Sequence, residues 1–245
     1  SVQMTNVSKN TSNAPQKPCL TGLSVTAAAC ATEETESVSG DSYSFLETDD
    51  SVAMILSDGV GSGESAARDS GRIVDLTERI LDAGLGPDMA MLFLNGMAGA
   101  EGDENRMATL DLCRIDLYRG ECETVKAGGA AGFIKRSDRV EKIQSRQLPL
   151  GMSASEDISE KKWQLNSGDL VILVSDGVVQ NWPCGDGEYL LEQKIASLNV
   201  SSPVDLANLI LRYAIRQCGG KIRDDMTVLV TGIWKNEERE IEDIE

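Results

Sequence analysis

The sequence predicts an α/β (α+β) domain in which mainly antiparallel sheets are layered with helices. Two apolar runs that are typical of buried strands, residues 52–56 and 170–174, each end in Ser-Asp-Gly. Further strand patterns follow one another at hairpin spacing between residues 107 and 145. Amphipathic helical patterns begin after Gly63 and again after Ser202. Strands clustered between helices indicate a layered domain.

Composition restricts the chemistry that this chain can perform. Its 245 residues suffice for one large domain, and 41% hydrophobic residues suffice for a sizeable core. The net charge of −17 argues against nucleic acid or an anionic membrane surface as a partner. Histidine is absent, which excludes Ser-His-Asp and Cys-His catalysis and His-ligated zinc. Acid–base chemistry therefore falls to carboxylates, Lys, Tyr, Cys or water activated by a metal ion.

The predicted domain boundaries lie where the periodic pattern of apolar residues begins and ends. Residues 1–18 are polar and aperiodic, so we expect a flexible segment or linker. Residues 19–235 form one predicted domain, and residues 236–245 form an acidic tail. The six cysteines contain no C-x-x-C pair, which is typical of reduced thiols in a cytosolic protein, and no apolar run is long enough to span a membrane. The chain begins with Ser1 rather than Met, so we expect a fragment of a longer protein.

The first half of the predicted domain surrounds the first Ser-Asp-Gly turn. Residues 21–32 are rich in alanine and β-branched residues and residues 43–46 form a short apolar run, so both are predicted strands. After the turn, apolar side chains recur at helical spacing, and Gly84 is typical of a helix end. These side chains are Ile73, Leu76, Ile80 and Leu81. Pro87 is typical of the first position of a second helix.

The second half begins with a meander and ends with two helices and a strand. The predicted strands of the meander cover residues 107–118, 122–127, 133–136 and 140–145. A helix is predicted over residues 189–198 after the second Ser-Asp-Gly turn. Ser202 as cap and Pro203 at the first helical position predict another helix. Residues 226–234 form the last predicted strand.

Four aspartates adjoin strand ends in repeated contexts. Asp58 and Asp176 each follow an apolar strand within Ser-Asp-Gly, whereas Asp41 and Asp224 precede strands. A single turn aspartate is ordinary turn chemistry, but the repetition predicts that these carboxylates converge. Mg²⁺ and Mn²⁺ prefer such oxygen ligands, and a pair of these ions can clamp a phosphoryl group and activate water. The pattern therefore favours metal-dependent phosphoryl chemistry.

The order of these motifs resembles the PPM (PP2C-like) family of metal-dependent protein phosphatases, most closely its sporulation branch. The resemblance covers roughly residues 19–235. Its motifs are Gly40-Asp41, Ser57-Asp58-Gly59-Val60-Gly61, Ala108-Thr109, Leu148-Pro149-Leu150-Gly151, Ser175-Asp176-Gly177 and Asp224-Asp225-Met226-Thr227. It implies a PP2C-like layered β-sandwich of mainly antiparallel sheets flanked by helices, with a pair of Mn²⁺ or Mg²⁺ ions at one end.

The resemblance also implies the roles of individual residues. The predicted metal ligands are the Gly59 carbonyl and the carboxylates of Asp41, Asp58, Asp176 and Asp224. Asp58 and Asp176 are the predicted catalytic residues, because they hold the ions that activate the attacking water. Asp225 is expected to support this set without binding the ions.

The implied reaction is hydrolysis of phosphoserine or phosphothreonine on a protein. The implied substrate is the phosphorylated anti-sigma-factor antagonist that controls a sporulation sigma factor. The resemblance further implies a cytoplasmic domain of a membrane-anchored parent, without membrane contact of its own, and is compatible with a homodimer.

The sequence departs from the eukaryotic members at three sites. Asp225 stands where those members often carry Asn. Val60 stands where those members carry a histidine that is the proposed acid for the leaving group, and Gly129-Ala130 stands where they carry Gly-Asp, which leaves a third metal open. In addition, no phosphate-binding arginine is identifiable near the N-terminal strands.

Other functions remain open from the sequence. Cys113 and Arg119 have the C-x₅-R spacing of cysteine phosphatases, but Cys113 lies within a predicted strand, whereas that chemistry needs a phosphate-binding loop. Residues 58–61 also resemble the D-x-G-x-G box of the histidine-kinase-like ATPases, which include anti-sigma-factor kinases. A catalytically inactive PPM-like regulatory module is a further alternative, although all four matching aspartates are present.

Overall fold

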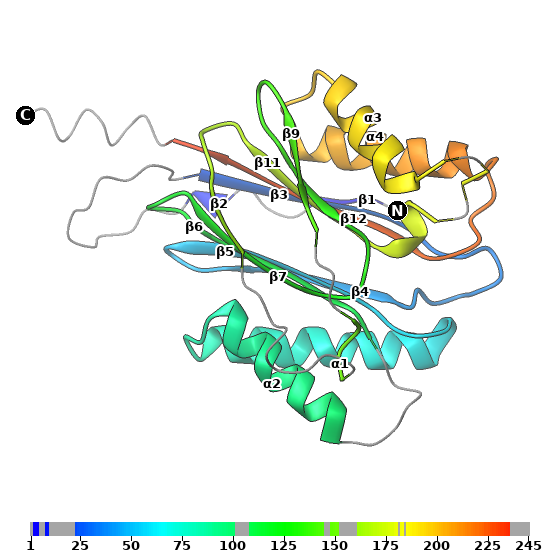
Figure 1. The fold of residues 1–245 in the computed structure, drawn as a ribbon, viewed down its shortest axis with the longest axis horizontal. Coiled ribbons are helices and arrows are strands. Elements are labelled where there is room, and N and C mark those ends of the chain that lie inside the picture. Colours follow the sequence, from blue (N-terminus) through cyan, green and yellow to red (C-terminus); the bar gives the residue numbers. More distant parts are fainter. Residues whose placement is uncertain are drawn as a thin grey trace, which may run out of the picture.

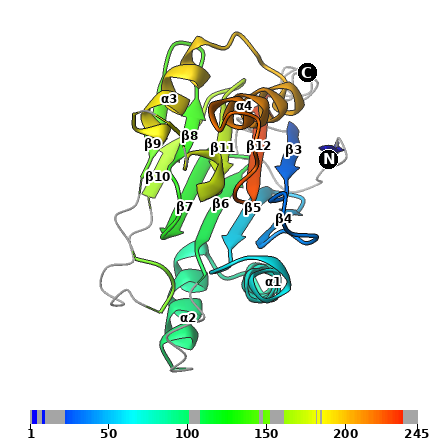
Figure 2. The ribbon, with the colours of Figure 1, turned by 90° about the vertical axis from the view of Figure 1, so that its right-hand side faces the viewer.

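The two β-sheets of the protein are stacked face to face, and a pair of helices covers the outer face of each sheet (Figure 1). The computed structural model describes residues 2–4, 8–9, 23–100, 108–144, 148–151, 161–180, 182–183 and 185–235. Within those ranges, every helix is too short or too polar to span a lipid bilayer. Figure 2 shows the same order of layers from the side, with α1 seen along its axis.

The five-stranded sheet contains the first Ser-Asp-Gly strand. Its strands lie in the order β10-β7-β6-β5-β4, and all neighbours are antiparallel. They are β4 (Asp41–Glu47), β5 (Ser51–Asp58), β6 (Leu110–Asp116), β7 (Glu121–Ala127) and β10 (Lys161–Gln164). β5 is buried on both faces except at its two ends, which explains its unbroken apolar run.

The second sheet has seven strands and contains the second Ser-Asp-Gly strand. Their order is β1-β3-β12-β11-β8-β9, and β2 also pairs with β3. They are β1 (Val2–Met4), β2 (Ser8–Lys9), β3 (Leu23–Ala31), β8 (Gly132–Lys135), β9 (Val140–Ile143), β11 (Leu170–Val174) and β12 (Met226–Trp234). All five residues of β11 are buried, because both of its faces are covered.

The helices begin and end where the sequence provides the appropriate residues. α1 (Gly63–Asp82) and α2 (Pro87–Ala100) cover the five-stranded sheet, while α3 (Gly187–Ser197) and α4 (Pro203–Gln217) cover the other (Figure 2). The Ser202 side chain accepts a hydrogen bond from the Asp205 N–H at 3.3 Å, which caps α4. Gly84 follows α1 with a φ of 81°, a left-handed conformation that favours glycine.

Apolar side chains fill all three spaces between the four layers. Met54, Leu56 and Leu173 belong to the cluster that lies between the sheets. One outer cluster packs α4 against β12 and β3, and the other packs α1 and α2 against the five-stranded sheet. Removing this apolar surface from water is the main stabilising contribution to such a layered fold.

The structure confirms the predicted α/β architecture of antiparallel sheets flanked by helices. The strand β10 is absent from the sequence-based prediction because its polar residues, which include Lys161 and Lys162, are mostly exposed at a sheet edge. The predicted linker, residues 1–18, lies mostly outside the described residues, but β1 and β2 within it pair with β3. The predicted acidic tail, residues 236–245, also lies outside them, so this domain division stays a prediction.

Candidate metal centre

Asp58 and Asp41 lie opposite each other at one end of the five-stranded sheet. Asp58 is the last residue of β5, Asp41 is the first residue of β4, and they are partners across the antiparallel ladder. The Gly59 N–H extends this pairing by donating to the Gly40 carbonyl at 3.2 Å. Thr109 holds the Asp58 backbone, because its Oγ1 accepts from the Asp58 N–H at 3.0 Å and its own N–H donates to the Asp58 carbonyl at 2.9 Å. Backbone pairing therefore sets the positions of both aspartates.

Asp176 and Asp224 are contributed by the other sheet. Asp176 follows β11 and begins the short 3₁₀ helix η2 (Asp176–Val178), while Asp224 lies just before β12. Since β11 and β12 are antiparallel neighbours, the end of one strand meets the beginning of the other. The Thr227 N–H donates to Ser175 Oγ at 2.9 Å, and the Ser175 N–H donates to the Thr227 carbonyl at 3.0 Å. These reciprocal hydrogen bonds fix the two aspartate-bearing segments relative to each other.

Asp41 connects the two sheets and has one free carboxylate oxygen. Thr227 Oγ1 of β12 donates to Asp41 Oδ2 at 2.7 Å, whereas the buried Asp41 Oδ1 has no hydrogen-bond partner. Burial is the main reason why the pKa of Asp41 is raised to about 7; the hydroxyls of Ser175 and Thr227 lower it, and the charges of Asp225 and Asp224 raise it. Buried polar atoms normally have partners, so this oxygen is available to bind a cation.

The four predicted aspartates come close enough together to perturb one another electrostatically. Burial, together with the charges of its neighbours Asp41, Asp224 and Asp176, raises the pKa of Asp58 to about 8. The pKa values of Asp176 and Asp224 are also raised, mainly by burial. Converging carboxylates without a counter-ion favour protonation, and a divalent cation would relieve the same repulsion.

The chemistry of this donor set fits Mn²⁺ or Mg²⁺. Among the described residues, no group of three Asp, Glu, Cys or His side chains is arranged so that it could hold a metal ion as it stands. The fit instead rests on oxygen donors alone, on their mutual repulsion and on the free Asp41 Oδ1, all of which suit a hard divalent cation. The carboxylates of Asp41, Asp58, Asp176 and Asp224 and the carbonyl of Gly59 therefore stay the predicted ligands, and the chemistry of oxygen donors suits them to this role.

A buried ion pair beside this cluster was missed by the sequence analysis. Lys126 Nζ of β7 contacts Asp111 Oδ1 of β6, and these side chains are only 4% and 3% exposed. Burial raises the pKa of Asp176, and the positive charge of Lys126 partly offsets this increase. The Lys126–Asp111 pair therefore lies near the aspartate cluster. The signal that could have revealed it is a pair of opposite charges in two neighbouring apolar strands, since hairpin register aligns Asp111 with Lys126.

Cys113 lies where cysteine-phosphatase chemistry is not possible. Its side chain is fully buried in the middle of β6, and its Sγ lies 3.2 Å from Cys122 Sγ. The neighbouring Cys113 thiol and burial raise the pKa of Cys122 well above its ordinary value. Arg119, which completes the C-x₅-R spacing, is largely exposed beside Asp116. A strand with no phosphate-binding loop cannot activate this thiol for attack on a phosphoryl group.

Comparison with solved structures defines the class of protein. The structure of the PP2C phosphatase domain with a fragment of the regulatory domain of SpoIIE from Bacillus subtilis superposes with a TM-score of 0.82 and 35% sequence identity. The match covers 87% of this chain and 64% of that chain. The fold is therefore the PP2C-like phosphatase fold. This result rules out the histidine-kinase-like ATPase alternative for residues 58–61, because that alternative requires a different fold.

The particular family follows from the sequence comparison. The family model described as stage II sporulation protein E (SpoIIE) matches residues 48–233, and the chain belongs to this family. The stage II sporulation protein E of Bacillus subtilis is 36% identical over 201 residues, which are 81% of this chain and 24% of that protein. The phosphoserine phosphatase RsbU of Bacillus subtilis is 24% identical over 200 residues, which are 79% of this chain and 59% of RsbU. The chain thus spans about a quarter of the length of its Bacillus subtilis SpoIIE relative.

Proposed function

We propose that this chain is a phosphatase domain that hydrolyses phosphoserine or phosphothreonine on a protein, with Mn²⁺ or Mg²⁺ as cofactor. The observation that carries the proposal is the cluster of four carboxylates contributed by both sheets, in which the buried Asp41 Oδ1 has no partner. The RsbU relative is called a phosphoserine phosphatase, which supports phosphoserine as the hydrolysed group.

The predicted ligands Asp41, Asp58, Asp176 and Asp224, together with the Gly59 carbonyl, would hold a pair of cations. Such cations, when bound, supply Lewis-acid activation of water and neutralise the charge that develops on the phosphoryl group. The chain itself provides the preorganised positions of the ligands. Thr227 orients Asp41 through its hydroxyl, and Thr109 holds the backbone of Asp58. Fixed ligands reduce the rearrangement needed before phosphoryl transfer.

The leaving serine oxygen takes its proton from water in this proposal. The residue after Gly59 is Val60, whose apolar side chain is 59% exposed and carries no transferable proton. With no histidine in the chain, a protein acid is not needed if solvent reaches the leaving group. Such a mechanism depends on an open active site.

The proposed substrate is the phosphorylated anti-sigma-factor antagonist that controls a sporulation sigma factor. Membership of the SpoIIE family and the sporulation names of the relatives support this choice. The proposal further places the domain in the cytoplasm as part of a longer, membrane-anchored parent, where it can form a homodimer. Chromatography of the parent protein and membrane fractionation test these two points.

Release of inorganic phosphate from a phosphoserine protein tests the proposed activity. We expect release with Mn²⁺ or Mg²⁺ and none after EDTA. Asp58→Asn and Asp176→Asn should abolish release while the protein stays folded, because each substitution removes a charged ligand. Asp138→Asn is a matched control, since Asp138 is exposed in the β8–β9 hairpin.

Two outcomes of this experiment would contradict the proposal. Wild-type protein that binds the phosphoprotein but releases no phosphate at any Mn²⁺ concentration would favour the inactive regulatory module. Loss of activity in a folded Cys113→Ser variant would favour thiol chemistry. We expect that variant to retain activity, because Cys113 is buried away from the carboxylates within the sandwich.

A further inference from the structure

Asp225 is a buried carboxylate with hydrogen bonds to both of its oxygens. Its side chain lies just before β12, and the residue is 5% exposed. Oδ1 accepts from the Glu33 N–H at 2.9 Å, and Oδ2 accepts from the Gly40 N–H at 2.6 Å. Both donors belong to the segment between β3 and β4, so one side chain just before the last strand holds the connection between these two strands.

The hydrogen bond to Gly40 reaches the metal centre directly, because Gly40 immediately precedes Asp41. The Gly40 carbonyl accepts from the Gly59 N–H at 3.2 Å and from Ser70 Oγ at 2.7 Å. The amide of Gly40 is therefore fixed by Asp225 while its carbonyl is fixed by β5 and α1. Movement of Gly40 would displace two predicted ligands, the Asp41 carboxylate and the Gly59 backbone.

The absence of a side chain at position 40 permits this close approach. A Cβ atom at Gly40 would lie 3.3 Å from Asp225 Oδ2 and 3.0 Å from the Ala66 Cβ, which is tighter than most real contacts. Glycine thus allows both the Asp225 carboxylate and α1 to approach the same residue closely. This close approach therefore depends on glycine at position 40.

We propose that Asp225 is a positioning residue of the metal centre, which clamps the segment from Glu33 to Gly40 so that Asp41 and Gly59 hold their places as ligands. This inference rests on the proposed function. In this chain the carboxylate accepts two N–H groups at once, one on each oxygen. An asparagine of the same shape has one acceptor oxygen and one NH₂ group. One of the two backbone N–H groups would therefore face another donor.

Asp225→Asn is consequently the sharpest test, because it changes hydrogen bonding with almost no change in volume. Calorimetric titration with Mn²⁺ should give an affinity about tenfold weaker than wild type, as is typical for loss of an outer-shell partner of a metal ligand. Amide exchange of Gly40 and Glu33 should become faster, because each N–H relies on this carboxylate. Turnover should be largely recovered at saturating Mn²⁺, since every ligand is still present.

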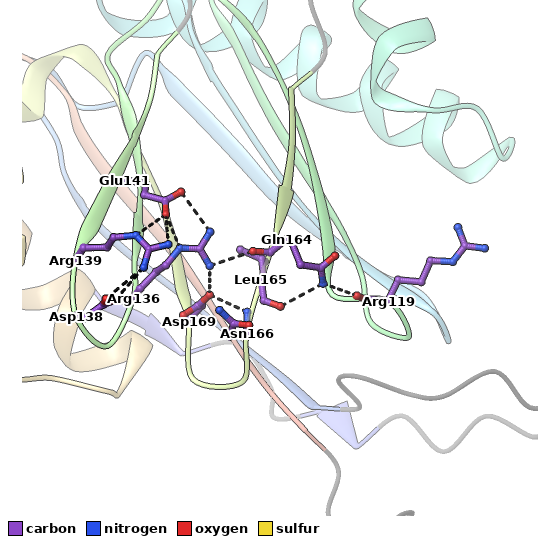
Figure 3. A network of polar contacts seen from close by, with 9 residues as sticks. All are labelled: Arg119, Arg136, Asp138, Arg139, Glu141, Gln164, Leu165, Asn166 and Asp169. Carbon is purple, nitrogen blue, oxygen red and sulfur yellow. Dashed lines mark hydrogen bonds and ion pairs between the residues drawn. The ribbon is translucent and has the colours of Figure 1, made fainter.

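Asp169 provides a matched control at the opposite end of β11 (Figure 3). It is 3% exposed, accepts from the Asn166 N–H at 2.8 Å, and pairs with Arg136 at 2.6 Å. Arg136 in turn pairs with Glu141 at 2.8 Å, so the network in Figure 3 is confined to that end of the sandwich. Asp169→Asn makes the same chemical change and should lower stability without altering Mn²⁺ affinity.

Different results separate failure of the inference from failure of the proposed function. Wild-type protein that binds no Mn²⁺ would contradict both. If wild type binds Mn²⁺ and Asp225→Asn binds it equally well, or Asp169→Asn weakens binding as much, the clamp is wrong. Turnover that saturating Mn²⁺ does not recover would contradict a role limited to positioning.

Should Asp225→Asn fail to fold, Glu33→Pro is the second test, because it removes one of the two N–H donors. This variant should also bind Mn²⁺ more weakly than wild type, and unchanged binding would contradict the clamp.

Discussion

Gly59 and Gly177, which follow the two catalytic candidates Asp58 and Asp176, are required for the same steric reason. A Cβ atom on Gly59 would lie 2.2 Å from the Ala66 carbonyl oxygen of α1, and one on Gly177 would lie 2.1 Å from the Asp225 carbonyl oxygen. Neither distance is compatible with a side chain. The Ser-Asp-Gly repeat therefore lets each aspartate-bearing turn pack tightly against another backbone segment, which fixes the carboxylate before it.

The raised pKa values of the aspartates predict opposite pH effects with and without metal. Asp41 and Asp58 have folded-state pKa values of about 7 and about 8, above the ordinary 3.8 of the unfolded chain. The folded state therefore binds protons more tightly, so this contribution to stability is fully present below about pH 3.8, decreases as pH rises, and is lost once pH has passed about 7 and 8. Metal-free protein should melt at a lower temperature at pH 8.5, about half a unit above the higher of these pKa values, than at pH 6, about one unit below the lower.

Mn²⁺ should reverse this dependence. Because the ion displaces protons from the carboxylates, its stabilising effect should be larger at the higher pH. Differential scanning fluorimetry at both pH values, with Mn²⁺ and with EDTA, measures this difference. An equal Mn²⁺-induced shift at both pH values would show that the ion binds elsewhere. Asp58→Asn, which removes one of the titrating groups, should reduce the pH dependence of the metal-free protein.

The buried pair Asp111–Lys126 predicts strong coupling between two substitutions. Lys126→Met alone leaves a carboxylate with almost no exposure, and breaking such a pair costs about 3–5 kcal/mol of the free energy of unfolding. Asp111→Leu combined with Lys126→Met replaces the pair by apolar groups and should be far less destabilising than either change alone. Urea denaturation of the four proteins of this double-mutant cycle measures the coupling. If the two single substitutions lowered the free energy of unfolding additively, the two charges would not stabilise each other.

At the scale of secondary-structure elements, α1 is attached to the segments around the candidate metal centre through three contacts. Gly59 packs against Ala66 of α1, and Ser70 Oγ of α1 donates to the Gly40 carbonyl at 2.7 Å. Ser70 Oγ also lies 2.7 Å from Ser42 Oγ on β4. The position of α1 is therefore coupled to that of the peptide units beside Asp41 and Asp58. A shift of this helix would alter both ligands together.

This coupling predicts that substitution of a core-facing residue of α1 changes the Mn²⁺ concentration that phosphate release requires. Ile73 of α1 and Ile215 of α4 are both half-buried against an apolar cluster, which makes Ile73→Ala and Ile215→Ala a matched pair. We expect both to lower stability, but only Ile73→Ala should raise the Mn²⁺ concentration needed for half-maximal phosphate release. Equal shifts in the two variants would show that α1 serves only as a packed core helix.

The sequence predicts the buried elements well because their periodicity is strong. β5 and β11 read as strands because both are apolar throughout, and α4 is recognisable from Ser202 and Pro203 at its start. β10 could not be predicted, because its polar residues belong to a strand only through pairing with β7. Strand assignment at such an edge depends on tertiary contacts rather than on local preference.

The candidate aspartates could be proposed from the sequence, whereas the contacts that support them could not. Aspartates at strand ends leave a recognisable pattern, so Asp58 and Asp176 were identifiable as candidates. By contrast, the partners of Asp41 and Asp225 lie 185 to 192 residues away along the chain. No local pattern encodes pairs so distant, because they form only when β12 is placed beside β3 in the folded sheet.

At the scale of the whole molecule, which carries a net charge of −17, the two-sheet architecture brings acidic side chains toward one end of the sandwich. Each sheet contributes a pair of aspartates, and the sheets are joined there by the hydrogen bond from Thr227 to Asp41. A cation bound between them would therefore link both sheets as well as neutralise the local charge. Stability and activity should depend on the same ion for this reason.

The central claim is that carboxylates from both sheets hold the same divalent ions, and calorimetric titration with Mn²⁺ tests it most directly. Wild-type protein should bind Mn²⁺, whereas Asp58→Asn on the five-stranded sheet and Asp176→Asn next to the seven-stranded sheet should each lose most of this binding. The account would be contradicted if wild type bound no Mn²⁺, or if either folded variant bound it with wild-type affinity.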